Sequence, residues 1–320
     1  MRVGIVGTGG MGNTHARQYS NMSGVDLGYY EPNQSRAESF EEKWTSQAFE
    51  SVEALIEWAD AVDVCLPTDV HPEVALKAIG ARKPVFLEKP IARTLEEATE
   101  VFEAAEAAGV PLMIGHVVRY FPEYALAHKM VLDGAVGKPA AIRTRRGGKA
   151  PTGSKGWFMD HSRSGGVLLD LAIHDFDWLR WTFGKVKFLY SKSLGAVSGQ
   201  GPDYALTTLT FESGAVAHVE STWMDPGGFR TTFDVAGSEG LLEFDSRKTP
   251  ALRTVTTDSL SLEPSIAAKD DPYYLELQGF LAAVAQSTPV PISGRDGLEA
   301  LKLSLAAIQS AKTGLVVTLD

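Results

Sequence analysis

A carboxylate and an imidazole one helical turn apart, Asp170 and His174, are the first side chains in this sequence that could do chemistry. They lie in Val167–Thr182, whose apolar periodicity predicts one amphipathic helix. At about 100° per residue, both fall on the face opposite the apolar one. There they can share a proton with a substrate hydroxyl, although a local ion pair has the same spacing. The preceding Gly165-Gly166 favours function, because it lets backbone approach a ligand closely.

Lys89 is the second candidate, because it follows a predicted strand, Pro84–Leu87, where that strand ends. Pro90 restricts the lysine to an extended conformation, and a lysine held in this way can polarise a carbonyl or anchor a hydroxyl. The alternative is a surface lysine paired with Glu88. Histidine has an unperturbed pKa of about 6.5, whereas a lysine base would need a strongly lowered pKa. We therefore assign proton transfer to His174.

A glycine-rich turn near the N-terminus predicts a dinucleotide site. An apolar strand ends in Gly7, Gly9 and Gly12, which permit the turn, the approach of a pyrophosphate and close packing of the next helix. A second predicted strand ends at Glu31, where a carboxylate can bind the ribose hydroxyls. Glu31 would repel a 2′-phosphate and so favours NAD. Arg36 could pair with that phosphate, and NADP remains the alternative.

Strands alternate with helices up to about residue 116, which predicts a doubly wound parallel sheet of the Rossmann type. Ligands bind such sheets beyond the carboxyl ends of the strands, and polar residues follow each predicted strand at that edge. The residues expected to contact the cofactor are Gly7, Thr8, Gly9, Gly10, Met11, Gly12, Glu31, Pro67, Thr68, His71, Glu88, Lys89, His116 and Arg119.

Beyond residue 119 the pattern changes to strands without intervening helices, which predicts a mainly antiparallel sheet and hence an α+β domain. We expect a division into 1–119 and 120–320, with the last helices packing back on the first domain. An antiparallel sheet with helices on one face leaves its other face available for a partner. The expected strands are Val186–Ser191, Tyr204–Phe211, Val216–Trp223, Thr231–Ala236 and Leu241–Phe244.

Composition narrows the class of protein. The chain has 320 residues, a formal charge of −10 and no long basic run, which argues against nucleic acid or an anionic membrane as partner. One cysteine, Cys65, excludes an internal disulfide, and no run of roughly 18 apolar residues could span a bilayer. A strand at the N-terminus leaves no room for a signal peptide, so we expect a cytoplasmic protein. No residue is assigned to a metal.

Three motifs in order resemble the glucose-fructose oxidoreductase, inositol dehydrogenase and rhizopine-catabolism (Gfo/Idh/MocA) family. They are the glycine turn at 7–12, Glu88-Lys89-Pro90, and the segment 165–175 that contains Asp170 and His174. The resemblance covers nearly the whole chain. It implies a Rossmann domain followed by an open-faced, substrate-binding sheet domain that forms homodimers or homotetramers. It also implies Lys89, Asp170 and His174 as catalytic residues.

The chemistry expected from this resemblance is oxidation of a secondary alcohol of a sugar or cyclitol. His174 takes the hydroxyl proton, the carbon gives its hydride to nicotinamide, Lys89 stabilises the developing alkoxide, and Asp170 orients the hydroxyl and the imidazole. Trp157 could provide a flat surface for the substrate ring or anchor the core. Basic residues of the segment 143–163 could bind a phosphate, but strand alternation places Arg143 and Arg145 opposite Arg146, so a neutral polyol is our first choice.

Two alternatives remain open. A glycosidase of the same family would use NAD only transiently, oxidising a sugar so that the glycosidic bond can be eliminated. A non-catalytic dinucleotide sensor would be expected to lose Lys89, Asp170 or His174, yet all three are present. The identity of the sugar, the direction of hydride transfer and the size of the oligomer are not specified by the sequence.

Overall fold

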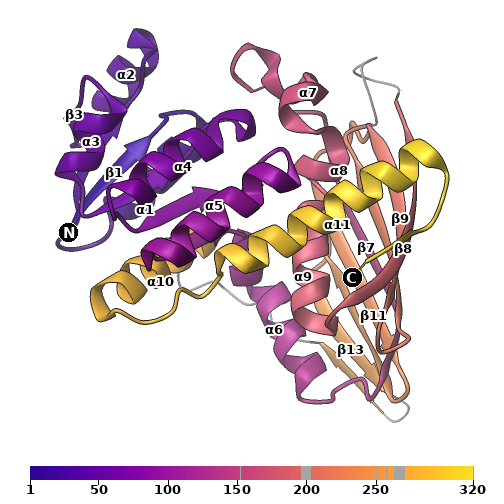
Figure 1. Ribbon diagram of the computed structural model, residues 1–320. Helices are drawn as coiled ribbons and strands as arrows, with labels where there is room; N and C mark the ends of the chain where they lie inside the picture. The colour runs from indigo at the N-terminus through magenta and orange to yellow at the C-terminus, as the bar shows by residue number, and fades with distance from the viewer. Residues whose placement is uncertain (152, 196–202, 250, 257–258, 263–270, 320) are drawn as a thin grey trace. The chain divides into compact units, whose positions relative to one another are not determined.

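The computed structural model describes residues 1–320 apart from 152, 196–202, 250, 257–258, 263–270 and 320 (Figure 1). Its internal contacts divide the chain into two compact units. The first unit combines residues 1–117 with 270–299, and the second combines 118–269 with 300–320. The division therefore falls close to residue 119, and the segment 270–299 returns to the first unit. Among the described helices, none has both the length and the apolar character needed to cross a bilayer.

The first unit contains the predicted parallel sheet, with strand order β3-β2-β1-β4-β5-β6. Because β1 lies between β2 and β4, the chain winds outward from β1 in both directions and creates the switch point at which doubly wound folds bind ligands. The two-residue strand β3 was not predicted, since it is too short to show periodicity. The strands are β1 (Arg2–Val6), β2 (Asp26–Tyr30), β3 (Gln47–Ala48), β4 (Ala61–Val64), β5 (Val85–Glu88) and β6 (Leu112–Gly115).

Two helices of the first unit begin at side-chain caps of a type that the sequence encodes locally. Thr94 and Glu97 form a capping box, in which the Glu97 N–H donates to the Thr94 hydroxyl at 3.2 Å. Ser51 likewise accepts the N–H of Ala54 at 3.1 Å. The helices are α1 (Gly10–Tyr19), α2 (Gln34–Glu41), α3 (Val52–Trp58), η1 (Thr68–Val70), α4 (His71–Gly80), α5 (Leu95–Ala108) and α10 (Pro272–Gln286).

The second unit contains a nine-stranded sheet of order β14-β13-β12-β11-β7-β10-β9-β8-β15. β7 and β10 run parallel, and every other neighbouring pair is antiparallel, which confirms the predicted mainly antiparallel sheet. The strands are β7 (Pro139–Gly147), β8 (Val186–Leu194), β9 (Tyr204–Phe211), β10 (Val216–Thr222), β11 (Arg230–Gly237), β12 (Gly240–Asp245), β13 (Leu252–Thr256), β14 (Leu260–Leu262) and β15 (Val317–Thr318).

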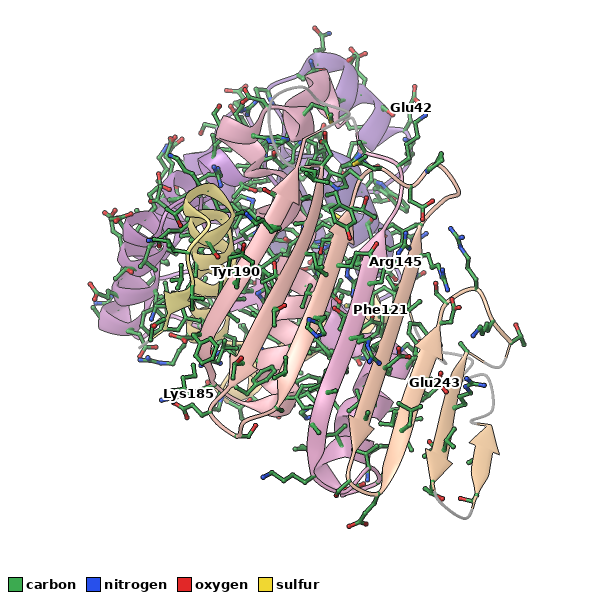
Figure 2. The ribbon with its side chains drawn as sticks, turned by 90° about the vertical axis from the view of Figure 1, so that its right-hand side faces the viewer. Glu42, Phe121, Arg145, Lys185, Tyr190 and Glu243 are labelled. Atoms are coloured by element: carbon green, nitrogen blue, oxygen red, sulfur yellow. The ribbon has the colours of Figure 1, made fainter. Side chains whose placement is uncertain are left out.

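Helices cover one face of this sheet and bury its alternate side chains. Trp178 packs against Phe233 at 5.0 Å between ring centroids, and Tyr124 packs against the same ring at 5.1 Å. The opposite face carries Tyr190, Arg145 and Glu243, and Figure 2 looks directly onto it. The helices are η2 (Val117–Tyr120), α6 (Pro122–Leu132), η3 (Ser154–Met159), α7 (His161–Ser164), α8 (Gly166–Asp170), α9 (Ile173–Phe183) and α11 (Gly294–Thr313), whose first residues belong to the first unit.

The prediction of one continuous helix over Val167–Thr182 is wrong. α8 ends at Asp170 and α9 begins at Ile173, and between them the Ala172 N–H donates to the carbonyl of Val167 instead of continuing the helical ladder. No glycine or proline marks this break. Three successive residues, 167–169, are buried, so protein surrounds α8 on more than one face and tertiary packing overrides the helical periodicity.

Two buried ion pairs hold the first turns of α9. Arg146 of β7 donates through Nε to Asp175 at 2.8 Å and through Nη2 to the Tyr124 hydroxyl at 3.1 Å. Arg119 donates to both carboxylate oxygens of Asp177, at 2.8 and 2.6 Å. Burial raises the pKa of Asp175 despite the neighbouring guanidinium. A carboxylate at this depth therefore depends on its arginine.

We predict that Arg146→Met lowers the free energy of unfolding by about 3–5 kcal/mol, because it leaves the buried Asp175 carboxylate without its charge partner. Urea denaturation followed by circular dichroism measures this change. Lys129→Met is the control, since Lys129 pairs with Asp133 on the exposed side of α6 in the same unit. An effect of Arg146→Met no larger than that of Lys129→Met would contradict the prediction.

Candidate functional site

The glycine turn between β1 and α1 has the shape of a phosphate cradle. Gly7 adopts a left-handed backbone with φ of +94°, which favours glycine. A Cβ on Gly12 would overlap the carbonyl oxygen of Gly7, so the close packing of α1 on the turn requires glycine there. At Gly9 and Gly10, by contrast, a Cβ would meet no atom within 4 Å. The space above the N-terminus of α1 is open, and this geometry fits a pyrophosphate.

Glu31 lies at the end of β2 beside this turn. The N–H and hydroxyl of Thr8 donate to its Oε2 at 3.2 and 3.1 Å, and the N–H of Asn33 donates to Oε1 at 2.9 Å. Arg36 donates to the same Oε1 at 2.6 Å. Only 3% of the Glu31 side chain is exposed, so the carboxylate is fixed in place. Arg36, the residue that could have favoured a 2′-phosphate, is paired with Glu31.

Sequence reasoning missed Asn13 as part of the turn. Its Nδ2 donates to the carbonyls of Thr8 and Gly9, at 2.8 and 3.0 Å, and Trp44 donates to its Oδ1 at 3.0 Å. An amide that ties down two consecutive carbonyls stiffens the turn. The signal was an asparagine directly after the last glycine, a residue type that bonds local backbone. Met11, a predicted cofactor contact, lies in the first turn of α1 and is half-buried.

The turn after β5 holds Lys89. Its backbone N–H donates to Glu88 Oε2 at 3.1 Å, and the Lys89-Pro90 peptide bond is cis. The ring of His71 lies 2.8 Å from the carbonyl of Pro90 through Nδ1 and 2.8 Å from the carbonyl of Leu66 through Nε2. His71 therefore joins the turn after β5 to the segment after β4. Its burial lowers the pKa of the imidazole.

The other predicted cofactor contacts lie at or just after strand ends. Pro67 and Thr68 follow β4, and Thr68, the first residue of η1, is buried. His116 follows β6 and is also buried, and its backbone N–H donates to the carbonyl of Ile114 at 2.8 Å. Arg119 makes the buried ion pair with Asp177 and lies over the Trp181 ring at 5.2 Å. The first unit thus places its predicted contacts along one edge of the sheet, whereas Arg119 belongs to the second unit.

Asp170 and His174 stand on either side of the break between α8 and α9. Asp170 is the last residue of α8 and only 9% exposed, whereas His174 lies half-buried in the first turn of α9. Gly165 and Gly166 have φ of +77° and +69°, so the tight turn before α8 accounts for both glycines. The second unit therefore contributes a carboxylate and an imidazole from two separate short helices.

Two strand arginines of the basic segment, Arg145 and Arg146, pair with carboxylates of the protein. Arg145 donates to Glu220 at 3.2 Å and to Asp225 at 2.9 Å on the open face of the sheet, whereas Arg146 binds Asp175 in the core. This confirms the alternation predicted from the sequence. Trp157 stacks on Phe158 with ring centroids 4.0 Å apart. The side chain of Lys155 lies outside the described residues.

His15 is not among the site residues expected from the sequence, and the structure places it at the centre of a buried polar cluster. Its Nδ1 lies 2.9 Å from Asp63 Oδ2 and 3.2 Å from Cys65 Sγ, and its Nε2 lies 3.2 Å from Glu88 Oε1. Burial acts to lower the pKa of His15, but the charge of Asp63, with Cys65 and the hydrogen bond to Asp63, raises it well above 6.5. An acid inside the apolar strand β4 was the signal, since a buried carboxylate needs a partner.

Known proteins resemble this chain along its whole length. Residues 1–116 match the family described as "Oxidoreductase family, NAD-binding Rossmann fold", and residues 124–243 match the "GFO/IDH/MocA C-terminal domain". A scyllo-inositol 2-dehydrogenase (NAD(+)) of Bacillus subtilis is 29% identical over 100% of this chain and 96% of its own. A myo-inositol 2-dehydrogenase of Thermotoga maritima is 29% identical over 100% of this chain and 99% of its own. The crystal structure of a probable dehydrogenase from Thermotoga maritima has a TM-score of 0.87 at 27% identity and covers 99% of this chain and 98% of that one.

We predict that Gly9→Ala and Gly12→Ala separate cofactor binding from folding. A methyl group at Gly9 has open space in the fold but intrudes on the cradle, so NAD affinity falls while the denaturation midpoint stays unchanged. A methyl group at Gly12 forces α1 away from the turn, so both quantities fall. Titration of protein fluorescence with NAD and thermal denaturation measure the two effects. Unchanged NAD affinity in Gly9→Ala would contradict the cradle, and a loss of stability equal to that of Gly12→Ala would contradict the open space at position 9.

Proposed function

Because the chain belongs to the Gfo/Idh/MocA family of oxidoreductases, we propose that it is an NAD-dependent dehydrogenase acting on a secondary alcohol of a cyclitol or a sugar. The observation that carries the proposal is the whole-length similarity to two inositol 2-dehydrogenases. It is supported by the presence of Lys89 directly after β5, Asp170 at the end of α8 and His174 in the first turn of α9. A cytoplasmic location remains a prediction from the sequence.

The residues of the first unit fit NAD as cofactor. The open cradle at Gly9 and Gly10 would take the pyrophosphate, and the Glu31 carboxylate would take the ribose hydroxyls. Bound NAD supplies a nicotinamide ring that accepts a hydride. Glu31 would also repel a 2′-phosphate, and its ion pair with Arg36 occupies the guanidinium that could otherwise bind one. We therefore propose NAD rather than NADP as the preferred cofactor.

His174 is proposed to take the proton of the substrate hydroxyl. An imidazole whose pKa lies close to neutrality can accept this proton and return it in the reverse reaction. Asp170, which precedes it across the helix break, orients the hydroxyl and the imidazole. The ammonium group of Lys89 stabilises the negative charge that develops on the same oxygen and can relay its proton. Hydride transfer from the carbon then completes the oxidation.

A neutral polyol is the proposed substrate class. Arg145 and Arg146 are each paired with carboxylates and lie on opposite faces of β7, which argues against a phosphate site formed by these two residues. Trp157 remains a proposed contact for the apolar face of a sugar ring. Both curated relatives are named for inositols, which have hydroxyl groups and no charge.

A substrate panel tests the proposed function. Cyclitols, aldoses, sugar phosphates and nucleotide sugars are offered with NAD or NADP, and NADH or NADPH absorbance is followed. We expect oxidation of a neutral cyclitol or sugar with NAD. His174→Asn and Lys89→Met should each lower kcat by about 10²- to 10⁴-fold, because each removes a group that acts on the proton or charge of the reacting hydroxyl. NAD binding by His174→Asn, measured by fluorescence titration, should stay within a small factor of that of the parent.

Other outcomes of the panel would replace the proposal. Release of free sugar from an aryl glycoside without net NADH formation would identify a glycosidase that uses NAD transiently. Binding of NAD without turnover of any panel member would favour a dinucleotide sensor. Oxidation at the parental rate by His174→Asn would remove His174 from its proposed role.

We also propose that the open face of the nine-stranded sheet joins two copies of the chain in a homodimer or homotetramer. Figure 2 looks onto this face, which carries Tyr190. Strand alternation places Phe188 on the same face as Tyr190, and Phe188 and Leu206 are 36% and 43% exposed. Burial of such a sheet face by a partner lowers the free energy of the assembly, because it removes apolar surface from water. Backbone pairing places Leu206 opposite Glu220, so apolar and charged groups alternate across the surface.

Leu206→Glu is predicted to reduce the oligomer to monomers, because it places a carboxylate in the buried face beside Glu220. Sedimentation velocity measures the size. Leu132→Glu is the matched control, because Leu132 is 65% exposed at the end of α6, away from the sheet. A parent that sediments as a monomer, or a Leu206→Glu variant of unchanged size, would contradict the proposal.

A further inference from the structure

One face of the parallel sheet buries a cluster of ionisable groups that the proposed mechanism does not use. The cluster consists of His15, Asp63, Cys65 and Glu88, and all four are less than 9% exposed. Residues 63 and 65 lie at alternate positions along and just beyond β4. Residue 88 ends β5, two residues after Phe86, which pairs with Asp63. Strand periodicity therefore directs these side chains to the face that α1 covers, where His15 contacts the Phe86 ring at 5.4 Å.

Contacts in the cluster form a continuous path from β4 to Lys89. Asp63 Oδ2 lies 2.9 Å from His15 Nδ1, and His15 Nε2 lies 3.2 Å from Glu88 Oε1. The other oxygen of Glu88, Oε2, accepts the backbone N–H of Lys89 at 3.1 Å. Cys65 joins at the side, with its Sγ 3.2 Å from His15 Nδ1 and 3.3 Å from Asp63 Oδ1. Along this path, the Glu88 carboxylate links the imidazole of His15 to the backbone of Lys89.

Charge favours an imidazolium in this position. The groups close to its ring are Asp63 on β4, Cys65 just after β4, Glu88 on β5 and Tyr273 on α10. Three further groups act electrostatically on these neighbours: Tyr19 on α1, Lys89 after β5 and Glu276 on α10. Burial acts to raise the pKa of the Glu88 carboxyl, but the hydrogen bond to His15 and its charge lower it. A neutral ring carries one N–H, whereas an imidazolium presents an N–H to both carboxylates at once. Each ring nitrogen lies close to a carboxylate oxygen, and this arrangement favours the charged form.

We propose that His15 is a positioning residue for Lys89, acting through the Glu88 carboxylate to fix the backbone from which the lysine extends. The inference rests on the proposed function, in which Lys89 stabilises the charge on the substrate oxygen. His71 anchors the next residue, through the carbonyl of Pro90 at 2.8 Å, so the turn is held at two successive positions. His15 lies on the helix that begins at the glycine cradle, one turn after Gly12. The helix that receives the cofactor therefore also sets the position of the lysine.

A double-mutant cycle tests the proposal. His15→Gln and Glu88→Gln should each lower kcat for polyol oxidation by about 10- to 100-fold, the scale of a misplaced catalytic group. The double variant should lose no more than the worse single variant, because both substitutions interrupt the same path. NAD affinity of His15→Gln, measured by fluorescence titration, should remain within about twofold of that of the parent. Cys65→Ala is the matched control, since Cys65 contacts His15 and Asp63 but is not on the path to Lys89.

A readout independent of turnover separates this proposal from the proposed function. The acylation rate of Lys89 by an amine-reactive reagent, followed by peptide mass spectrometry, should change in His15→Gln and Glu88→Gln and stay unchanged in Cys65→Ala. If the parent oxidises no panel member, the proposed function fails while this comparison still tests the positioning path. If His15→Gln does not fold, Glu88→Gln carries the comparison with Cys65→Ala.

Three results would overturn the positioning role. The first is a double variant whose kcat falls by the product of the two single-variant factors, because independent effects would multiply in this way. The second is that all three single variants, Cys65→Ala included, lose the same factor in kcat and the same amount in denaturation midpoint. This result would show a purely structural cluster. The third is one zinc ion per parental chain by elemental analysis that His15→Gln loses, because the ring would then bind a metal together with Asp63 and Cys65, whose ligand-type atoms lie within 4.8 Å of one another.

Discussion

The close approach of α1 to the turn after β1 is the constraint on which the rest of the first unit depends. Gly12 lies against the carbonyl of Gly7, where no side chain fits. This contact sets the helix axis and brings the N-terminus of α1, which has no side-chain cap, to the open cradle at Gly9 and Gly10. One turn later, His15 of the same helix contacts Asp63 of β4 and Glu88 of β5. A single packing contact thus fixes an anion site and a buried charge together.

Buried charges in both units hold short elements that have little stability of their own. α8 has five residues and α9 begins only after a break, so neither would persist as an isolated helix. Arg146 and Arg119 bind Asp175 and Asp177, which follow His174 in the first turns of α9. An ion pair at this depth gains little net free energy, because desolvation offsets the attraction, but it penalises every arrangement that separates the partners. Its contribution is therefore geometric precision rather than stability.

Much of this architecture could be predicted from the periodicity and the motifs of the sequence. The alternation of strands and helices, the capping box at Thr94 and the strand Tyr204–Phe211 all follow from local pattern. The break between α8 and α9 could not be predicted, because Leu171 and Ala172 are good helix formers and the cause lies in packing from several sides. The role of His15 was also hidden, since a histidine on a helix has no local signature. Its partner Asp63 did leave one, as an acid within an apolar strand.

The pairing of arginines also bears on what the chain can recognise. A sequence with Arg36, Arg145 and Arg146 near its predicted ligand regions has the guanidinium groups that a phosphate would need. Each of the three instead binds a carboxylate of the same unit, so an incoming phosphate would have to displace that carboxylate and leave it without its partner. For the buried pair of Arg146 this exchange carries the desolvation cost of an isolated acid. A neutral ligand avoids this cost, because it carries no anionic group that would compete for the three guanidinium groups and so leaves their ion pairs in place.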